Sequence, residues 1–259
     1  MLASYHTHTY RCKHAVGKEE EYIQKAIAEG VRILGFSDHA PMLYPNGYVS
    51  GHKMGPEMIG EYFSTIASLR DKYKDKIEIK IGLETEYYPS LWESSLEFWR
   101  PYPVDYIILG QHFVPEEIVG TDAYCGRPSE SKTRLTVYVD AVIKAMNSGV
   151  ITYVAHPDLI NYTGDDHDFY LSECHRLVSE AERLGMPLEY NLLGMHLGRN
   201  YPYAPFWEVV REYDIKTVIG CDSHAPERVA DKDEILRAKE YLSGLGITPL
   251  DVIPLVTPF

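Results

Sequence analysis

The first fourteen residues hold three histidines at spacings that suit metal binding. His6 and His8 are two residues apart, and His14 follows six residues after His8. On an extended backbone, side chains at positions i and i+2 point to the same face, so His6 and His8 can reach one ion together. Two strand histidines alone would more often be structural, and the later segments therefore decide the question.

Further histidines and carboxylates come directly after apolar, strand-like runs. With the first three histidines, the candidate metal ligands are His6, His8, His14, His39, Glu84, His112, His156, Asp222 and His224. Nine side chains supplied by six separate strands are poorly explained as satisfied core groups. They also exceed the four to six ligands of one divalent ion, so the sequence predicts two to three ions that share a bridging carboxylate. Zinc, iron and manganese all accept this ligand set.

Short apolar runs alternate with longer amphipathic ones along the whole chain. The predicted strands end within residues 6–8, 33–36, 77–83, 106–109, 151–155, 188–191 and 217–220. The predicted helices span residues 18–29, 57–74, 130–147, 168–184, 205–213 and 232–242. This alternation is typical of βαβ units with a parallel sheet. Seven such units in 259 residues predict one α/β domain, residues 1–259, with a barrel one strand short of the usual eight.

The expected barrel explains why the candidate ligands follow strands. In β/α barrels the active site lies at the C-terminal ends of the strands, so all nine ligands should meet at one mouth. Arg199 follows the sixth strand, on a loop at the same mouth, and its planar guanidinium suits an anionic group such as phosphate. Arg11 and Lys13, between the ligands His8 and His14, are second candidates for binding such a group.

Composition narrows the class of protein. A net charge of −13 and the lack of a basic stripe argue against nucleic acid as a partner, whereas a small anionic substrate is compatible with a local cluster of cations. No apolar run is long enough to span a membrane, and the first ligand at His6 leaves no room for a signal peptide, so we expect a cytoplasmic protein. The four cysteines are scattered, as reduced thiols are. The sequence specifies no oligomeric state.

Taken together, the motifs resemble those of the polymerase and histidinol phosphatase (PHP) superfamily. The resemblance rests on the initial HxH, on His14, and on Ser37-Asp38-His39, Gly82-Leu83-Glu84, Gln111-His112-Phe113, Ala155-His156-Pro157-Asp158 and Asp222-Ser223-His224. It implies a distorted seven-stranded TIM-like barrel. The segment from Gly35 to Pro41 and the chain length resemble the histidinol-phosphatase branch, which hydrolyses L-histidinol phosphate to L-histidinol and phosphate in histidine biosynthesis.

The resemblance also implies how the ligands divide among the ions. His6, His8, Glu84 and Asp222 would hold one ion, Glu84, His112 and His156 a second, and His14, His39 and His224 a third. Glu84 would bridge the first two. We expect Glu84, Asp222 and Arg199 to be the catalytic residues and a metal-bound hydroxide to be the nucleophile, because no GxSxG elbow is present and Cys12 lacks the spacing of a cysteine phosphatase.

Several expectations concern the surroundings of the site. Asp38 could orient His39 or simply cap a turn. The segments 41–56 and 115–128 are possible lids over the mouth, and Tyr44, Tyr48 and Tyr124 in them could pack on a substrate ring. Of the other histidines, His196 could lie near the mouth, whereas three are expected at the surface: His52, His167 and His175.

Three other classes remain open beside a small-molecule phosphomonoesterase. One is a superfamily phosphoesterase that acts on nucleotides, oligonucleotide ends or phosphotyrosine. Another is an amidohydrolase-type enzyme, which also begins with HxH but typically bridges its ions with a carboxylated lysine, where this chain has Glu84. The last is a metal-binding module without catalysis.

Overall fold

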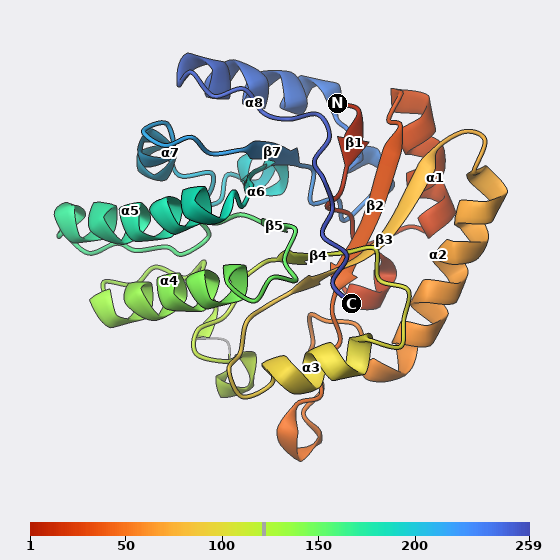
Figure 1. Cartoon of the computed structure of the whole chain (residues 1–259), viewed down its shortest axis with the longest axis horizontal. Helices are drawn as coiled ribbons and strands as arrows, with labels where there is room; N and C mark the ends of the chain where they lie inside the picture. The colour runs from red at the N-terminus through yellow and green to blue at the C-terminus, as the bar shows by residue number, and fades with distance from the viewer. Residues whose placement is uncertain (121–122) are drawn as a thin grey trace.

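Seven parallel strands form one sheet whose spatial order follows the chain. The computed structural model describes residues 1–120 and 123–259 (Figure 1). The strands are β1 (Ala3–Ser4), β2 (Ile33–His39), β3 (Glu78–Thr85), β4 (Tyr106–Leu109), β5 (Tyr153–Val154), β6 (Leu188–Asn191) and β7 (Thr217–Gly220). In the longest pairing, β2 runs beside β3 from Ile33 opposite Glu78 to His39 opposite Glu84. This register places two predicted ligands side by side at the C-terminal ends of their strands.

The two edges of the sheet meet just beyond β1 and β7. Thr7 and Ser223 form a parallel bridge, in which the His8 N–H donates to the Ser223 carbonyl at 2.9 Å and the Ser223 N–H donates to the His6 carbonyl at 3.1 Å. The sheet is therefore a nearly closed barrel, and the predicted distorted seven-stranded β/α barrel is confirmed. The closing contacts also bring the HxH segment beside the Asp222-Ser223-His224 segment.

Helices surround the barrel and cover its outer face (Figure 1). They are α1 (Glu19–Glu29), α2 (Ile59–Tyr73), α3 (Trp92–Trp99), α4 (Lys132–Met146), α5 (His167–Leu184), α6 (Leu192–Leu197), α7 (Ala204–Val210) and α8 (Lys232–Gly244). Six match the predicted helices, but α3 and α6 were not predicted. Among the described residues, no helix has both the length and the apolar character needed to cross a membrane.

The helix α6 changes the context of Arg199, which was expected on a loop directly after the sixth strand. Asn191, the last residue of β6, caps this helix, because its side-chain oxygen accepts the N–H of Gly194 at 2.9 Å. Gly198 ends the helix in a left-handed conformation, with a φ of 61°. Arg199 therefore follows a helix of fewer than two turns rather than a strand.

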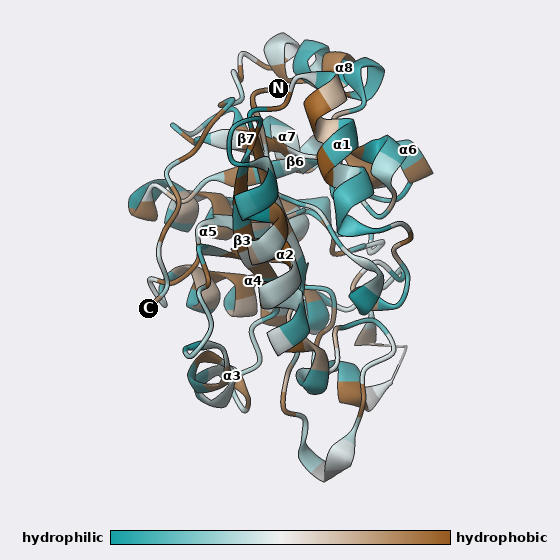
Figure 2. Ribbon diagram, turned by 90° about the vertical axis from the view of Figure 1, so that its right-hand side faces the viewer, coloured by the Kyte–Doolittle hydropathy of each residue, from teal (hydrophilic) through white to brown (hydrophobic). Residues whose placement is uncertain are grey.

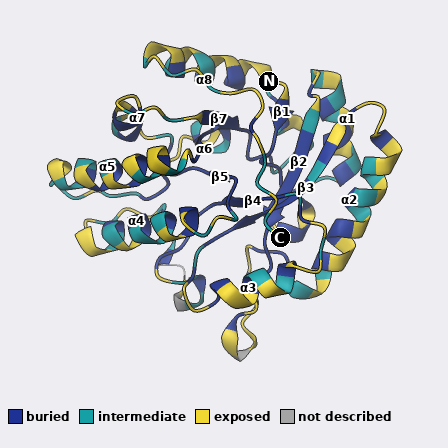
Figure 3. Ribbon diagram, in the orientation of Figure 1, coloured by how far each residue is buried: buried dark blue, intermediate teal, exposed yellow. Residues whose placement is uncertain are grey.

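Apolar side chains pack on both faces of the sheet, inside the barrel and between the sheet and the helices. On β4, Tyr106 and Ile108 point into the barrel, and the alternate residues Ile107 and Leu109 pack against the surrounding helices. Figure 2 shows the central strands largely in brown, the hydrophobic colour, and Figure 3 shows the strands largely buried, whereas exposed residues lie mainly on the outer sides of helices and in loops. The interior is thus a packed core and not a channel.

The C-terminal segment after α8 closes the N-terminal end of the barrel. The Leu250 N–H donates to the Thr217 carbonyl at 2.8 Å, and the Val256 N–H donates to the Thr152 hydroxyl at 3.1 Å. Between them, the buried side chain of Ile253 joins the apolar cluster inside the barrel. Figure 1 shows this segment running across the strands to the C-terminus. The C-terminal segment thus closes the N-terminal end of the barrel, and the polar side chains gather at the opposite, C-terminal end of the strands.

Candidate metal centre

All nine predicted ligand side chains gather at the C-terminal mouth of the barrel. His39 is the last residue of β2, and Glu84 is the last residue but one of β3. The other ligands follow β1, β4, β5 and β7. Their rings form a continuous series: the ring centroids lie 5.1 Å apart for His6 and His8, 4.4 Å for His8 and His39, 5.1 Å for His39 and His112, and 4.8 Å for His112 and His156. Strands that are distant in sequence thus build one compact site.

Glu84 occupies the middle of this cluster and is 2% exposed. Its two oxygens lie 2.8–3.7 Å from ring nitrogens of His6, His8, His39, His112 and His156. Burial alone would raise the pKa of Glu84, but the neighbouring imidazoles, His39 foremost, outweigh burial and hold it well below its usual value. An ionised carboxylate with different histidines around each oxygen has the arrangement of a bridging ligand.

The absence of a side chain at Gly110 makes room for Glu84. A methyl group built on Gly110 would overlap the Oε1 atom of Glu84 and contact its carboxyl carbon at 2.6 Å. Gly110 follows β4, next to β3 in the sheet, where the backbone must pass close to the carboxylate. The Gly110-Gln111-His112 motif therefore supplies both a ligand and the space for its neighbour.

A second carboxylate, Asp222, faces the HxH pair. Its Oδ1 atom lies 3.1 Å from Nε2 of His8 and 3.5 Å from Nε2 of His6. Asp222 and His156 both have left-handed backbones, with φ values of 48° and 29°. Such conformations cost of order 1–3 kcal/mol in non-glycine residues and cluster at functional sites. Here the turns after β5 and β7 are bent so that both side chains reach the centre.

Unsatisfied buried atoms show that the centre fits metal ions. Four buried atoms that face one another make no hydrogen bond within the described structure: Nε2 of His6, Nε2 of His8, Oε2 of Glu84 and Oδ1 of Asp222. Buried polar atoms are almost always hydrogen-bonded, so a group of such atoms needs an explanation. Imidazole nitrogens and carboxylate oxygens are ligands of zinc and similar ions. Divalent ions would satisfy all four atoms, and the residues present therefore fit metal ions.

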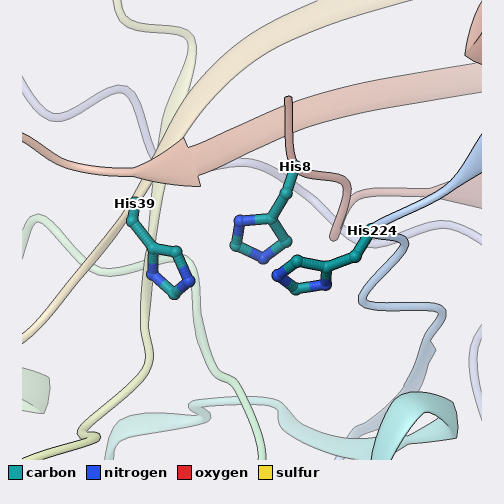
Figure 4. A group of neighbouring side chains, drawn as sticks. All are labelled: His8, His39 and His224. Atoms are coloured by element: carbon teal, nitrogen blue, oxygen red, sulfur yellow. The ribbon is translucent and has the colours of Figure 1, made fainter. Parts of the chain in front are cut away.

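The third predicted ligand group lies at the edge of the cavity. His8, His39 and His224 face one another in Figure 4, and the Nε2 atoms of His224 and His14 are 3.0 Å apart. Burial lowers the pKa of His14 and of His39, and burial with the nearby His8 lowers the pKa of His224 to about 3. These imidazoles are therefore neutral near pH 7, which is the form that binds metal.

Sequence reasoning missed Glu189, a carboxylate inside the barrel. Glu189 is fully buried on β6, and both of its oxygens lie 3.0 Å from Nδ1 of His6. Asn191 donates to Glu189 at 3.2 Å and to Asp222 at 3.1 Å. A carboxylate on the far nitrogen of a histidine fixes the ring so that its other nitrogen faces a metal ion. Gly220 leaves space for Glu189, because a methyl group built there would overlap Oε1 of Glu189.

Two other carboxylates orient ligands from outside the cluster. Asp38 approaches Nδ1 of His8 at 3.5 Å and accepts the backbone N–H of His39 at 2.9 Å. Its expected role on the His39 ring is therefore replaced by contact with the His8 ring, because Nδ1 of His39 is turned toward Glu84. Glu86, which the sequence did not single out, lies 3.4 Å from Nδ1 of His112.

A cavity of about 720 Å³ opens over the ligand cluster. This volume suits a small organic molecule. Ligands such as His39, His112 and Asp222 line its floor, and Arg199 and Tyr201 line its wall. The Arg199 guanidinium donates to the Tyr201 hydroxyl at 3.0 Å, which holds it on the cavity side. The structure therefore brings Arg199 to the same cavity as several of the predicted metal ligands.

The two alternative phosphate-binding residues lie elsewhere. Arg11 is 1% exposed, pairs with Glu19 and approaches Glu61 at 3.1 Å. Lys13 donates to the carbonyl of Ser50. Neither belongs to the described residues that line the cavity. Carboxylates engage the charge of Arg11, and Lys13 lies outside the cavity lining, so Arg199 is the best placed of the three.

Both predicted lid segments contribute to the cavity. His52 and Lys53 line it from segment 41–56, and Tyr124, Gly126 and Arg127 line it from segment 115–128, of which residues 121 and 122 lie outside the described residues. Tyr44 and Tyr48 instead bond to the buried Glu117.

The structure confirms some of the expected positions of the remaining histidines and not others. His52 is exposed, as expected, and also lines the cavity. His196 was expected near the mouth but pairs with Glu234 of α8 at 2.8 Å. His167 is exposed as expected, whereas His175 is half-buried against the Tyr213 hydroxyl at 2.8 Å.

The chain belongs to the PHP family, because a family model described as "PHP domain" matches residues 4–192. Among its relatives, the "Probable histidinol-phosphatase" of Deinococcus radiodurans is 26% identical over 232 residues, which cover 88% of each chain. The protein of the same name in Schizosaccharomyces pombe is 27% identical over 278 residues, which cover 98% of this chain and 90% of the relative. The family expected from the motifs is confirmed.

A solved structure supports the fold over the whole length. The histidinol phosphate phosphatase of Lactococcus lactis, crystallised with zinc, L-histidinol and phosphate, matches with a TM-score of 0.76 and 20% sequence identity. The match covers 99% of this chain and 98% of the Lactococcus chain. At this identity the likeness is evidence for the fold.

Proposed function

We propose that this protein is a metal-dependent phosphomonoesterase and that L-histidinol phosphate is its substrate. The observation that carries the proposal is the position of Glu84, whose two oxygens face different histidines beneath a cavity that also holds Arg199. With ions bound, a centre of this kind would place positive charge next to Arg199, which can itself bind phosphate. The names of the relatives favour histidinol phosphate within the broader class of phosphomonoesters.

The proposed ligand assignment follows the three groups of side chains. His6, His8, Glu84 and Asp222 would hold one ion, Glu84, His112 and His156 a second, and His14, His39 and His224 a third. Two to three ions of zinc, iron or manganese suit these nitrogen and oxygen ligands. When bound, such ions acidify water and neutralise charge on phosphoryl oxygens.

The protein's own side chains supply orientation and charge. Glu84 and Asp222 contribute the negative charge that keeps several cations close together, and Glu189 and Asp38 hold His6 and His8 in place. Arg199 offers a planar pair of donors to the phosphoryl oxygens that face the cavity. The large cavity admits a small phosphorylated molecule, and the acidic surface disfavours long nucleic acid. We place the reaction in the cytoplasm.

A substrate panel tests this proposal against its alternatives. The protein loaded with zinc or manganese is incubated with histidinol phosphate, nucleoside monophosphates, phosphotyrosine and amide substrates, and release of phosphate or amine is measured. We expect the highest kcat/KM for histidinol phosphate. A preference for nucleotides or phosphotyrosine would keep the phosphoesterase class and overturn the substrate. Amide hydrolysis alone would establish the amidohydrolase reading, and no turnover would leave a binding module.

A further inference from the structure

Lys53 is a buried lysine on the wall of the cavity. It is 4% exposed and lies in segment 41–56, far in sequence from its partners. Its Nζ atom lies 2.6 Å from Oε2 of Glu86 and 2.8 Å from Oε2 of Glu117, both of which are also buried. Lysine is almost never buried this deeply unless it is paired. The carboxylates of Glu86 and Glu117 therefore account for the burial of Lys53.

Glu86 connects Lys53 to a predicted metal ligand. Its Oε1 atom lies 3.4 Å from Nδ1 of His112 and accepts the backbone N–H of His112 at 3.2 Å. Its Oε2 atom accepts the Tyr88 hydroxyl at 2.6 Å and faces Lys53. One carboxylate thus holds both the ring and the backbone of His112. The opposite nitrogen of that ring, Nε2, is then directed at Glu84 Oε1, 3.7 Å away.

Lys53 supplies the positive charge that compensates the buried carboxylate of Glu86. A buried carboxylate without a cationic partner is costly, and removing the partner of a buried ion pair leaves an uncompensated charge. The Nζ atom of Lys53 also lies 5.3 Å from the centroid of the Phe113 ring, the residue after His112. Lys53 therefore contacts both the carboxylate that holds His112 and the residue next to it. Without Lys53, Glu86 would keep a buried charge with no cationic partner, and its hold on the His112 ring would weaken.

The far end of the network fastens Lys53 itself. Glu117 accepts the Ser50 hydroxyl at 2.6 Å and the Tyr44 hydroxyl at 3.0 Å, and both of these residues lie in the same segment as Lys53. The amine is therefore fixed from two directions and is not free to swing into the cavity.

We propose that Lys53 and Glu86 are positioning residues for His112 and thereby set the affinity of the one ion that His112 binds. The inference rests on the proposed function only in requiring metal ions at the nine-ligand centre. The series runs from Lys53 to Glu86, from Glu86 to Nδ1 of His112, and from Nε2 of His112 to the ion. The ion assigned to His6 and His8 has its own supports, since Glu189 holds His6 and Asp38 holds His8. The third group, His14, His39 and His224, does not include His112.

The test compares ion affinities in purified, fully loaded protein. In Lys53→Met, we expect one ion to dissociate about 10 to 100 times more readily in stepwise chelator competition, the usual effect of losing a partner behind a metal ligand. The remaining ions should keep their affinities. In cobalt-substituted protein, the visible absorption of one ion should shift. Lys53→Arg should restore part of the lost affinity, because arginine can pair with both carboxylates.

Two further variants keep the test decisive. Glu86→Gln keeps the size of the side chain and should show the same loss at one ion, even if Lys53→Met folds poorly. Lys72→Met removes an exposed lysine that pairs with Glu20 on the outside of the barrel and should change no ion affinity.

Unchanged affinities in both Lys53→Met and Glu86→Gln would overturn the inference. An equal loss of every ion would also overturn it, because that pattern indicates general loosening. Failure of the proposed function would appear separately, as wild-type protein that binds no ions or hydrolyses no phosphomonoester.

Discussion

Replacing Glu84 with glutamine removes the charge at the middle of the cluster while keeping the size of the side chain. The oxygens of Glu84 lie 2.8–3.7 Å from five imidazole nitrogens, so ions bound by those histidines would lie within about 4 Å of the carboxylate. At an effective dielectric of about 20, a unit charge at this distance interacts with a doubly charged ion by roughly 8 kcal/mol. Loss of a third of that interaction already corresponds to about a hundredfold in rate.

We therefore expect Glu84→Gln to lower kcat/KM for histidinol phosphate by at least about a hundredfold and to lower the number of ions bound per chain. Phosphate release gives the first quantity and elemental analysis the second. His167→Ala, a change at an exposed residue of α5, serves as the control and should affect neither. Equal effects of the two changes, or full ion content and activity in Glu84→Gln, would refute the assignment of Glu84 as the bridge.

Three further changes test the surroundings of the centre. Arg199→Ala should weaken transition-state stabilisation by roughly 2–4 kcal/mol without loss of ions, and Arg199→Lys should recover only part, whereas near-normal kcat/KM would show that Arg199 is a surface charge. Gly110→Ala should displace Glu84 and reduce both activity and ion content, whereas Gly60→Ala, where a methyl group meets open space on α2, should leave both unchanged. Removing the ions with a chelator should lower the melting temperature, since ions at about 100 times their Kd stabilise the folded state by about 2.7 kcal/mol; an unchanged melting temperature would contradict bound ions.

The sequence was most informative where a ligand follows a strand. Local apolar runs predict β2 and β3, and their parallel pairing alone brings His39 opposite Glu84. The helix α6 was missed because it has only six residues and follows β6 without a connecting loop, so no periodic pattern can develop. Six residues give less than two helical turns.

Carboxylates that hold the ligands from behind were harder to predict. Glu189 alternates with apolar residues on β6, and this pattern usually indicates a side chain that faces solvent. In this barrel the same face points to the inside of the mouth, where His6 provides a polar partner. Lys53 was missed for another reason: its partner Glu117 is 64 residues away, and only the assembled fold brings these loops together.

The central claim is that the nine-ligand centre hydrolyses a phosphomonoester by using more than one metal ion. The most direct measurement is a titration of metal-free protein with zinc or manganese, in which bound ions per chain and phosphate release from histidinol phosphate are determined in the same samples. We predict that activity appears only after a second ion binds and reaches its maximum at two to three ions per chain. Full activity with one ion or none, or no phosphate release at full occupancy, would contradict the claim.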